Sequence, residues 1–424
     1  MTKEDSAFAK ALAVGRPPNI ARLFPHSRAL IVSGKVIDRA LRAKGRAMTI
    51  AANCRNSFVL RGALLAAKRA NAAIILEIAR SEANYCDLSM WNLATWADQA
   101  MNELDITVPV AIHADHYGIK NVEDVPVAKA EIPTMFEAGI TSIAIDASHL
   151  PDAENLLANI ALAPMVPAYA GYETEVGEIK GASGLSTPAE ALFLIRGLNA
   201  HDIHPDWIAL NNGTTHGIEA SGTGIQVGLT ASIHQALAPY GLSGAQHGTS
   251  GNDSARLQEI AAQTATTKAN VATALQMVSW GVAVNDNGNA ALSADGQLIK
   301  KPGQGVDDAV WAEMQTYAAA KGLKAGDYKK LNKAFENKLL AQPEPVRRRM
   351  IEAVADFAFW LLTDVFNATD TAPLATALLA DAGTFDLGPK AGRIENPADW
   401  TREGILAKAK ALSQDKGQAG NFDD

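Results

Sequence analysis

The chain has 424 residues, of which 48% are hydrophobic and 20% are charged, and its formal net charge is −8. This composition predicts one large globular domain with extensions, and the acidic balance argues against a nucleic acid partner, because phosphate backbones favour basic surfaces. The chain has two cysteines, no apolar run long enough to span a membrane and no signal-peptide core after Met1. We therefore expect a cytoplasmic protein without a membrane partner.

Strand-like and helical segments alternate along the chain. Eight runs of small and branched apolar residues predict strands at 47–53, 73–79, 108–115, 142–148, 166–175, 207–212, 243–249 and 268–273. Helical patterns fall between most of them, at 57–71, 91–103, 124–138, 152–162, 187–199 and 253–265. This order predicts an α/β fold, a (β/α)8 TIM barrel over residues 46–285. A doubly wound sheet is less favoured, because no Gly-x-Gly-x-x-Gly turn follows the first strand.

Two further segments flank the expected barrel. Residues 1–45 form an N-terminal lead-in with a helix, and residues 286–424 form a loop followed by a C-terminal helical extension. The extension shows helical patterns at 307–320, 328–340 and 344–367, and the last of these begins with three arginines at 347–349. We expect that helix to pack on the barrel or on another subunit. The alternative is that its arginines bind an anion in a neighbouring active site.

Three histidines follow strand-like runs and predict a metal site. His116 closes the third strand, and His216 and His247 follow the sixth and seventh strands and precede glycines. The carboxyl ends of barrel strands carry the chemistry of this fold. Neutral imidazoles bind divalent transition metals, and three of them leave a coordination position open for a substrate. Each histidine alone would be an ordinary polar loop residue, but three in the same context favour one metal centre.

Acidic residues accompany these histidines at the strand ends. Asp115 precedes His116, and since neighbouring strand residues point to opposite faces, a bend is needed for both to serve one site. Asp115 would then be suited to proton transfer on a metal-bound substrate. Glu173 and Glu175 share one face of the fifth strand. Glu175 is a candidate fourth metal ligand or orienting carboxylate, whereas Glu173 would support the barrel interior.

Supporting groups and a possible anion site complete the pattern. His113 is expected to support the site by a hydrogen bond, and Asp146, at the end of the fourth strand, is expected to do the same or to offer an alternative metal position. Small residues follow the histidines directly at Gly217, Gly248 and Ser250. Their backbone N–H groups are suited to hold a phosphate, which barrels commonly bind after their last strands.

These motifs, in this order, resemble those of the class II, metal-dependent fructose-bisphosphate aldolase family over most of residues 45–285. The segments that carry the resemblance are 113–116, 145–150, 173–177, 213–217, 247–251 and 268–273. The resemblance implies a homo-oligomer with a zinc-like ion on His116, His216 and His247. It also implies proton transfer by Asp115 on the aldehyde-side hydroxyl, substrate positioning by Asn270, and a phosphate held by Gly217, Gly248, Ser250 and Thr273.

The residues around the substrate depart from the family pattern. Ala272 replaces an acidic residue, Ala220 falls near a phosphate-facing lysine, Ala79 replaces a serine, and Glu77 replaces an amide. Residues 180–183 replace a loop that carries a mobile acid, and Arg80 or Lys180 could supply replacement cations.

Three hypotheses follow from these departures. The first is a metal-dependent aldolase that cleaves or forms a sugar phosphate, either fructose 1,6-bisphosphate or a related ketose phosphate. The second is an epimerase or lyase acting on an unphosphorylated ketose or sugar acid, and the third is a non-catalytic barrel. Zinc is the favoured metal, and cobalt, manganese or iron would also fit three histidines and a carboxylate.

Overall fold

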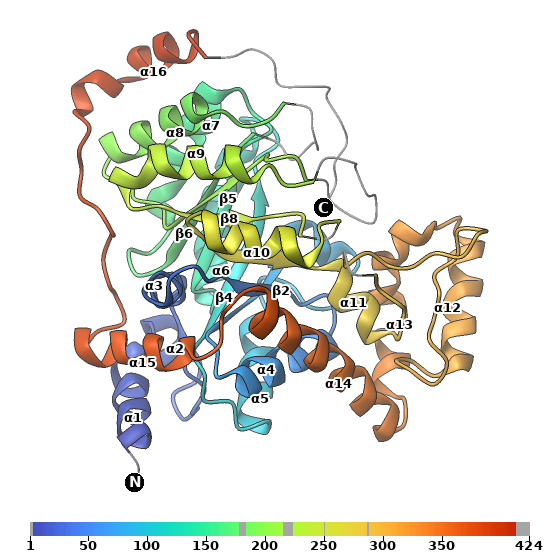
Figure 1. Ribbon diagram of the computed structural model, residues 1–424. Coiled ribbons are helices and arrows are strands. Elements are labelled where there is room, and N and C mark those ends of the chain that lie inside the picture. Colours follow the sequence, from blue (N-terminus) through green and yellow to red (C-terminus); the bar gives the residue numbers. More distant parts are fainter. Residues whose placement is uncertain (1–2, 178–183, 215–223, 250, 286–287, 413–424) are drawn as a thin grey trace.

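A closed barrel of eight parallel strands forms the centre of the molecule (Figure 1). The computed structural model describes residues 3–177, 184–214, 224–249, 251–285 and 288–412. The barrel strands are β2 (Thr49–Asn53), β3 (Ile74–Ala79), β4 (Val110–Gly118), β5 (Ser142–Asp146), β6 (Gly171–Val176), β7 (Trp207–Leu210), β8 (Ser243–Gln246) and β9 (Thr266–Val271). Each strand pairs with its neighbours in chain order, and β9 closes the ring on β2. The predicted TIM barrel is therefore confirmed.

Helices follow the barrel strands. They are α4 (Ser57–Ala70), α5 (Leu93–Glu103), α6 (Asp124–Glu137), α7 (Asp152–Leu162), α8 (Pro188–Ala200), α9 (Val227–Leu237), α10 (Ser254–Gln263) and α11 (Thr273–Ser279). Local sequence explains where several of them begin. Thr187 and Glu190 form a capping box at the start of α8, where Pro188 takes the first position, and the Asn56 side chain accepts from the amide of Val59 at the start of α4. Helix α9 was not predicted from the sequence.

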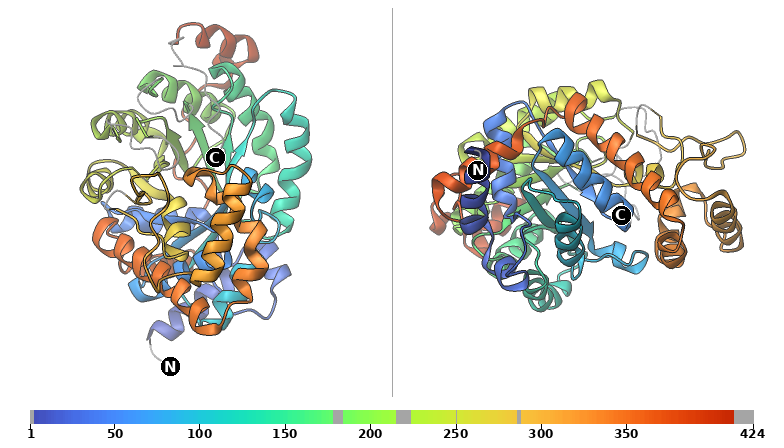
Figure 2. Two further views of the ribbon diagram at one scale, coloured as in Figure 1. Left: turned by 90° about the vertical axis from the view of Figure 1, so that its right-hand side faces the viewer. Right: turned by 90° about the horizontal axis from the view of Figure 1, so that it is seen from below.

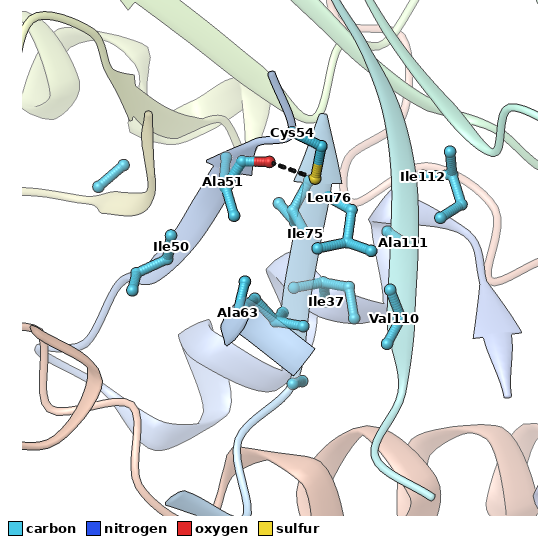
Figure 3. Packing of buried hydrophobic residues seen from close by; sticks show 14 of the residues in the cluster. Ile37, Ile50, Ala51, Cys54, Ala63, Ile75, Leu76, Val110, Ala111 and Ile112 are labelled. Carbon is cyan, nitrogen blue, oxygen red and sulfur yellow. Dashed lines mark hydrogen bonds between the residues drawn. The ribbon is translucent and has the colours of Figure 1, made fainter. Parts of the chain in front are cut away.

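The core lies between the strands and the helices around them. Figure 3 shows Ile50, Ile75 and Val110 on three neighbouring strands, with Ile37 of helix α3 (Gly34–Lys44) and Ala63 of α4 in the same cluster. These strand residues are fully buried, because the strands are covered on both faces. Burial on both faces explains why the sequence shows near-continuous apolar runs rather than an apolar and polar alternation.

The lead-in closes the amino-terminal end of the barrel. It comprises α1 (Lys3–Gly15), α2 (Pro18–Leu23), β1 (Ile31–Val32), which pairs with β4, and α3 (Gly34–Lys44). A Cβ atom on Gly34 would lie 2.6 Å from the Ser142 hydroxyl, and one on Gly171 would lie 3.0 Å from the Gly34 Cα. Further along α3, Asp38 accepts a hydrogen bond of 2.6 Å from Thr267. With α3 packed this closely against one end, a substrate has to enter the barrel at the other.

The residues after the barrel wrap around both of its ends. They form α12 (Asp308–Ala320), η4 (Ala325–Lys330), α13 (Leu331–Leu340), α14 (Glu344–Trp360), a π-helical turn η5 (Leu361–Val365), α15 (Thr371–Ala382), η6 (Pro397–Trp400) and α16 (Arg402–Ala409). Figure 1 places α12 and α13 on one side of the barrel and the irregular connection from α15 to α16 on the other, the side of α3. Figure 2 gives two further views. Along that connection, the Lys390 ammonium contacts Asp38.

Helix α14 packs directly on the barrel. It lies along α4, where a Cβ on Gly62 would come within 2.5 Å of Val354. This is the barrel-packing arrangement expected for the helix at 344–367. The division into 1–45, 46–285 and 286–424 remains our proposal for the domain organisation. Among the described residues, no helix is long and apolar enough to cross a membrane.

Candidate active site

A cavity of about 1160 Å³ opens at the carboxyl end of the barrel strands. Its floor carries Asp115, His116, His247 and Asn270, which come from β4, β9 and the end of β8. Residues 323–330 of the C-terminal extension also line the cavity. The cavity therefore brings together strand-end residues that are far apart in the chain, as the sequence predicted for a barrel active site.

A bend in β4 turns both Asp115 and His116 toward this cavity. The pairing of β4 with β5 shifts register between Ala114 and Tyr117, and His116 has a φ of +42°, which is uncommon for a residue other than glycine. Without the bend, the two side chains would point to opposite faces of the strand. The irregularity that the adjacent Asp115 and His116 require is therefore present.

His116 is held by two carboxylates. Its Nδ1 lies 3.3 Å from Oδ2 of Asp146 and 3.6 Å from Oε2 of Glu175, and both carboxylates are buried. Ligand atoms of these three residues lie within 4.8 Å of one another, so Glu175 is within reach of both roles expected for it, metal ligand and orienting carboxylate. Burial alone would raise the pKa of Asp146, but the hydrogen bond from His116 holds it well below its ordinary value.

His247 presents an imidazole nitrogen suited to a metal. Its Nε2 lies 2.9 Å from Oε1 of Glu173, and since an ionised carboxylate only accepts, Nε2 carries the proton. The other nitrogen, Nδ1, is buried and has no hydrogen-bond partner among the described residues. The His247 and His116 rings are 4.4 Å apart between centroids, and both residues belong with Asp115 to a cluster whose ligand atoms lie within 4.8 Å.

This donor set fits a divalent transition metal. A carboxylate that fixes the protonated nitrogen of a ligating histidine is the usual support for such a site. His216, Gly217 and Ser250 lie outside the described residues, so their predicted parts in the metal and phosphate sites stay predictions. Gly248, with a φ of +59°, and Thr273 both line the cavity.

A buried lysine joins the acidic residues beneath the cavity. The Nζ of Lys268, on β9, lies 2.8 Å from Oε2 of Glu173, 3.3 Å from Oε2 of Glu77 and 3.6 Å from Oδ1 of Asp115. It also lies 3.1 Å from Nε2 of His113. Glu77, His113 and Asp115 have the spacing of a metal cluster, but the Lys268 ammonium lies within 3.6 Å of all three and would repel a cation there. This favours His116 and His247 over the layer beneath them as candidate metal ligands.

The charged layer sets the protonation of its members. Burial would raise the pKa of Asp115, but His116 and Lys268 hold it well below its ordinary range, and Lys268 and His247 likewise lower the pKa of Glu173 to about 2. Burial and the Lys268 charge lower the pKa of His113 to about 3, so its ring is neutral. Asp115 is thus an ionised carboxylate next to the candidate metal ligands, which is the state required of a proton acceptor.

Asn270 connects Asp115 to the cavity. Its Nδ2 donates a hydrogen bond of 3.0 Å to Oδ1 of Asp115, while its own Oδ1 is buried and has no partner among the described residues. The Oδ1 of Asn53, at the end of β2, is also buried and has no described partner. Both amides line the cavity and offer acceptors for substrate hydroxyl groups.

Sequence reasoning missed several residues of this site. Lys268 gave a signal, because a charged residue within a predicted buried strand needs polar or charged partners inside the barrel. Asn53 is the last residue of β2 and Arg55 lies two residues further on, in a polar run that resembles the other strand ends, and both line the cavity. Arg80, considered as a replacement cation, instead pairs with Glu131 at 2.8 Å.

Comparison with known proteins assigns the family. Residues 35–334 match the family model described as fructose-bisphosphate aldolase class-II. The chain belongs to the class II fructose-bisphosphate aldolase family. The resemblance drawn from the strand-end motifs is thereby confirmed.

Individual relatives are more distant. The chain is 31% identical to the fructose-bisphosphate aldolase of Staphylococcus aureus over 134 residues, which cover 30% of this chain and 42% of that protein. It is 28% identical to the fructose-bisphosphate aldolase of Mycoplasma pneumoniae over 168 residues, or 39% of this chain and 54% of that protein. The chain thus spans about half the length, or less, of these curated relatives, which marks it as a divergent family member.

Solved structures with the same fold are similar over most of the chain. The YdjI aldolase from Escherichia coli K12 aligns with a TM-score of 0.54 at 15% identity and covers 81% of this chain and 99% of its own. The fructose-bisphosphate aldolase from Campylobacter jejuni gives a TM-score of 0.55 at 16% identity, over 81% and 97% of the two chains. At these identities the likeness supports the fold and carries no information on the substrate.

Proposed function

We propose that this protein is a metal-dependent aldolase that cleaves or forms a ketose phosphate by reversible aldol chemistry. The observation that carries the proposal is the placement of ionised Asp115 beside the paired rings of His116 and His247, with the unpartnered Nδ1 of His247 among them. A barrel that served only as a scaffold would gain nothing from a buried imidazole nitrogen without a partner. Fructose 1,6-bisphosphate or a related sugar phosphate is the proposed substrate.

The chain's own groups account for the proton transfer. The Asp115 carboxylate accepts the proton from the hydroxyl on the carbon that becomes the aldehyde, and the bond from that carbon to its neighbour nearer the ketone breaks. The electron pair stays with the carbon nearer the ketone, which takes up a proton to complete cleavage. Asn270 holds Asp115 through Nδ2 and offers its Oδ1 to a substrate hydroxyl. In the direction of synthesis, Asp115 returns the proton.

We propose that His116, His216 and His247 hold a divalent ion, with zinc favoured. When bound, such an ion polarises the ketone carbonyl and stabilises the negative charge that cleavage produces. Glu173 and Asp146 orient the two described rings, and Glu175 either joins the ligands or orients His116. Gly217, Gly248, Ser250 and Thr273 hold the phosphate next to the ketone. We further propose a homo-oligomer in the cytoplasm, where the two buried cysteines stay free.

Cleavage of fructose 1,6-bisphosphate, measured as triose phosphate release with and without a chelator, tests this function. We expect chelator-sensitive cleavage by the wild type and loss of activity in His216→Ala and His247→Ala. The circular dichroism of both variants should match that of the wild type. The control is His204→Ala, because this ring pairs with Asp202 outside the cavity. Full activity of His216→Ala would refute the metal assignment.

A folded, metal-loaded protein that cleaves no ketose phosphate would refute the aldolase proposal. The second candidate, an epimerase or lyase for an unphosphorylated ketose or sugar acid, would then take its place. It uses the same metal and carboxylate, and the alanines at positions 79 and 272, both on the cavity wall, favour it. Assays with neutral ketoses and sugar acids distinguish the two candidates.

A further inference from the structure

A buried arginine on the cavity wall has no part in the proposed chemistry. Arg55 lies two residues after the end of β2, is 6% exposed and lines the cavity beside Thr273. Its Nε donates to Oε1 of Glu82, whose Oε2 accepts from the amide of Ala79. These bonds fix the plane of the guanidinium, so it does not swing into solvent as a surface arginine does.

The remaining donors of this arginine converge with a hydroxyl group. Its Nη1 donates to Oγ1 of Thr273 at 3.3 Å and lies 3.4 Å from Oε1 of Gln276. Nη2 makes no hydrogen bond with a described residue. Because Thr273 Oγ1 accepts from Arg55, its own proton is directed elsewhere, and it finds no acceptor among the described residues. Two adjacent groups on the cavity wall therefore have hydrogen atoms to donate.

The C-terminal extension adds positive charge to the lining of the same cavity. Its turn contributes Lys324, Lys329 and Lys330 to the cavity lining. Lys329 lies over the Tyr85 ring, 5.7 Å from its centroid. The turn is anchored to the barrel, because the amide of Lys333 donates to the carbonyl of Tyr85 at 2.9 Å.

A second anchor holds the extension next to Arg55 itself. The Asn56 side chain donates to Oδ1 of Asn332 at 3.2 Å, so the residue after Arg55 is tied to helix α13. The cavity lining carries five cationic side chains, Arg55, Lys120 and the three lysines of the turn, against the four carboxylates of Glu82, Asp115, Asp295 and Asp327. The excess of positive charge attracts a negatively charged ligand.

We propose that Arg55, together with Thr273 and the lysine turn at 324–330, forms a subsite for the anionic group of the substrate. A fixed guanidinium beside a hydroxyl donor matches the paired oxygens of a phosphate or a carboxylate. This inference rests on the proposed function, in which Thr273 already holds the phosphate. It adds the charged member to a site whose other predicted members, Gly217, Gly248 and Ser250, are neutral.

The alternative is that Arg55 serves only to neutralise Glu82. That role uses Nε and explains neither the bond to Thr273 nor the place of the guanidinium on the cavity wall. A purely structural pair would also be replaceable by two neutral side chains without effect on ligand binding. The subsite and the structural role therefore differ in a measurable way.

The test removes the pair as a unit and measures anion binding without turnover. The double variant Arg55→Gln/Glu82→Gln avoids leaving one buried charge unpaired. The matched control is Arg61→Gln/Glu103→Gln, which removes a pair at 2.6 Å between α4 and α5, away from the cavity. Binding of inorganic phosphate, of gluconate as a sugar acid and of neutral fructose is measured by calorimetry on the proteins as purified.

We expect the wild type to bind one of the two anions, phosphate or gluconate, and the control variant to bind that anion with the same affinity. The Arg55 variant should bind it about 10- to 100-fold more weakly. All three proteins should bind fructose with the same affinity. Arg55-dependent binding of phosphate identifies a sugar phosphate, and the same result with gluconate alone identifies a carboxylate. Equal anion binding by the Arg55 variant and the wild type would overturn the proposal.

Two further measurements separate this inference from the proposed function. If the double variant does not fold, Arg55→Lys takes its place in the test. This variant keeps the charge and loses the second donor, so it should also bind the anion more weakly than the wild type. Arg55-dependent anion binding without cleavage of any ketose phosphate would support the subsite and refute the aldolase. Cleavage whose kcat/KM does not change in the Arg55 variant would refute the subsite alone.

Discussion

Replacing Lys268 with methionine tests the charged layer inside the barrel. The Lys268 side chain is fully buried, and its Nζ lies 2.8 Å from Glu173 and 3.6 Å from Asp115. At an effective dielectric constant of about 20, a carboxylate at about 3 Å attracts an ammonium by about 5–6 kcal/mol. The cost of desolvating both groups offsets part of this attraction. Removal of one member of a buried ion pair therefore costs about 3–5 kcal/mol.

Protonation of Glu77 removes one of the buried negative charges that Lys268 balances, so the loss of unfolding free energy stays within this range. Burial and the nearby Asp115 charge raise the pKa of Glu77 well above its ordinary value, so this carboxyl takes up a proton when Lys268 is absent. Glu173 and Asp115 lose the Lys268 charge that helps to lower their pKa values, so they carry the penalty of burial without it. We therefore expect Lys268→Met to lose about 3–5 kcal/mol of unfolding free energy.

Urea unfolding followed by circular dichroism measures this loss. The control is Lys338→Met, which removes an exposed ion pair with Glu313 and should cost less than about 1 kcal/mol. We expect the midpoint of Lys268→Met to fall to a clearly lower urea concentration than that of the control. If the two variants lost equal stability, the reasoning that the Lys268 charge holds the barrel interior together would be refuted.

Three further predictions concern catalysis, packing and pH. Asp115→Asn should lower kcat by about 10²- to 10⁴-fold, the usual contribution of a proton acceptor, with metal content unchanged by elemental analysis; activity near that of the wild type would remove Asp115 from the mechanism. Gly34→Ala should cost about 1–3 kcal/mol in urea unfolding, because its Cβ would lie 2.6 Å from the Ser142 hydroxyl. Its control is Gly228→Ala, whose Cβ meets nothing within 4 Å and which should lose no stability. Burial raises the pKa of Glu336 from 4.5 to about 7, so its contribution to stability is present below pH 4.5 and is lost as pH rises through 7. The wild type should therefore lose up to about 3 kcal/mol more than Glu336→Gln between pH 5 and pH 9, and equal pH dependence of the two proteins would contradict the raised pKa.

The barrel itself was predictable because its signals are local. Apolar runs such as 73–79 and 142–148 are long enough for strands, and helix starts such as Thr187 and Pro188 are visible without a structure. The strand β1 was missed because two residues give no period to detect. Helix α9 was missed because it follows a Gly-rich segment and its sequence has no strong N-cap residue. In the structure, its N-cap residue Gln226 makes no side-chain capping hydrogen bond.

The candidate site was predictable where a side chain conflicted with its strand. Histidines and acids at the ends of apolar strands have no structural need to be there, which is why Asp115, His116 and His247 stood out. The adjacency of Asp115 and His116 also required a bend, and the φ of +42° at His116 provides it. Asn53 and Arg55 carried a similar but weaker signal, because polar residues after a strand are common in loops.

The sequence by itself determined the order of strands and helices and the polar residues at the strand ends, because each depends on neighbours a few residues apart. That order predicts a barrel, but the closing pairs join β2 to β9, the first and last barrel strands in the chain. Only the tertiary structure decided which of those side chains meet. Lys268 contacts Glu173 across 95 residues of chain, and Arg55 contacts Thr273 across 218. The placement of residues 323–330 over the cavity is equally non-local. Such contacts form only when the barrel closes and the extension packs against it. Both events join segments that are far apart in the chain, so no local pattern in the sequence predicts them.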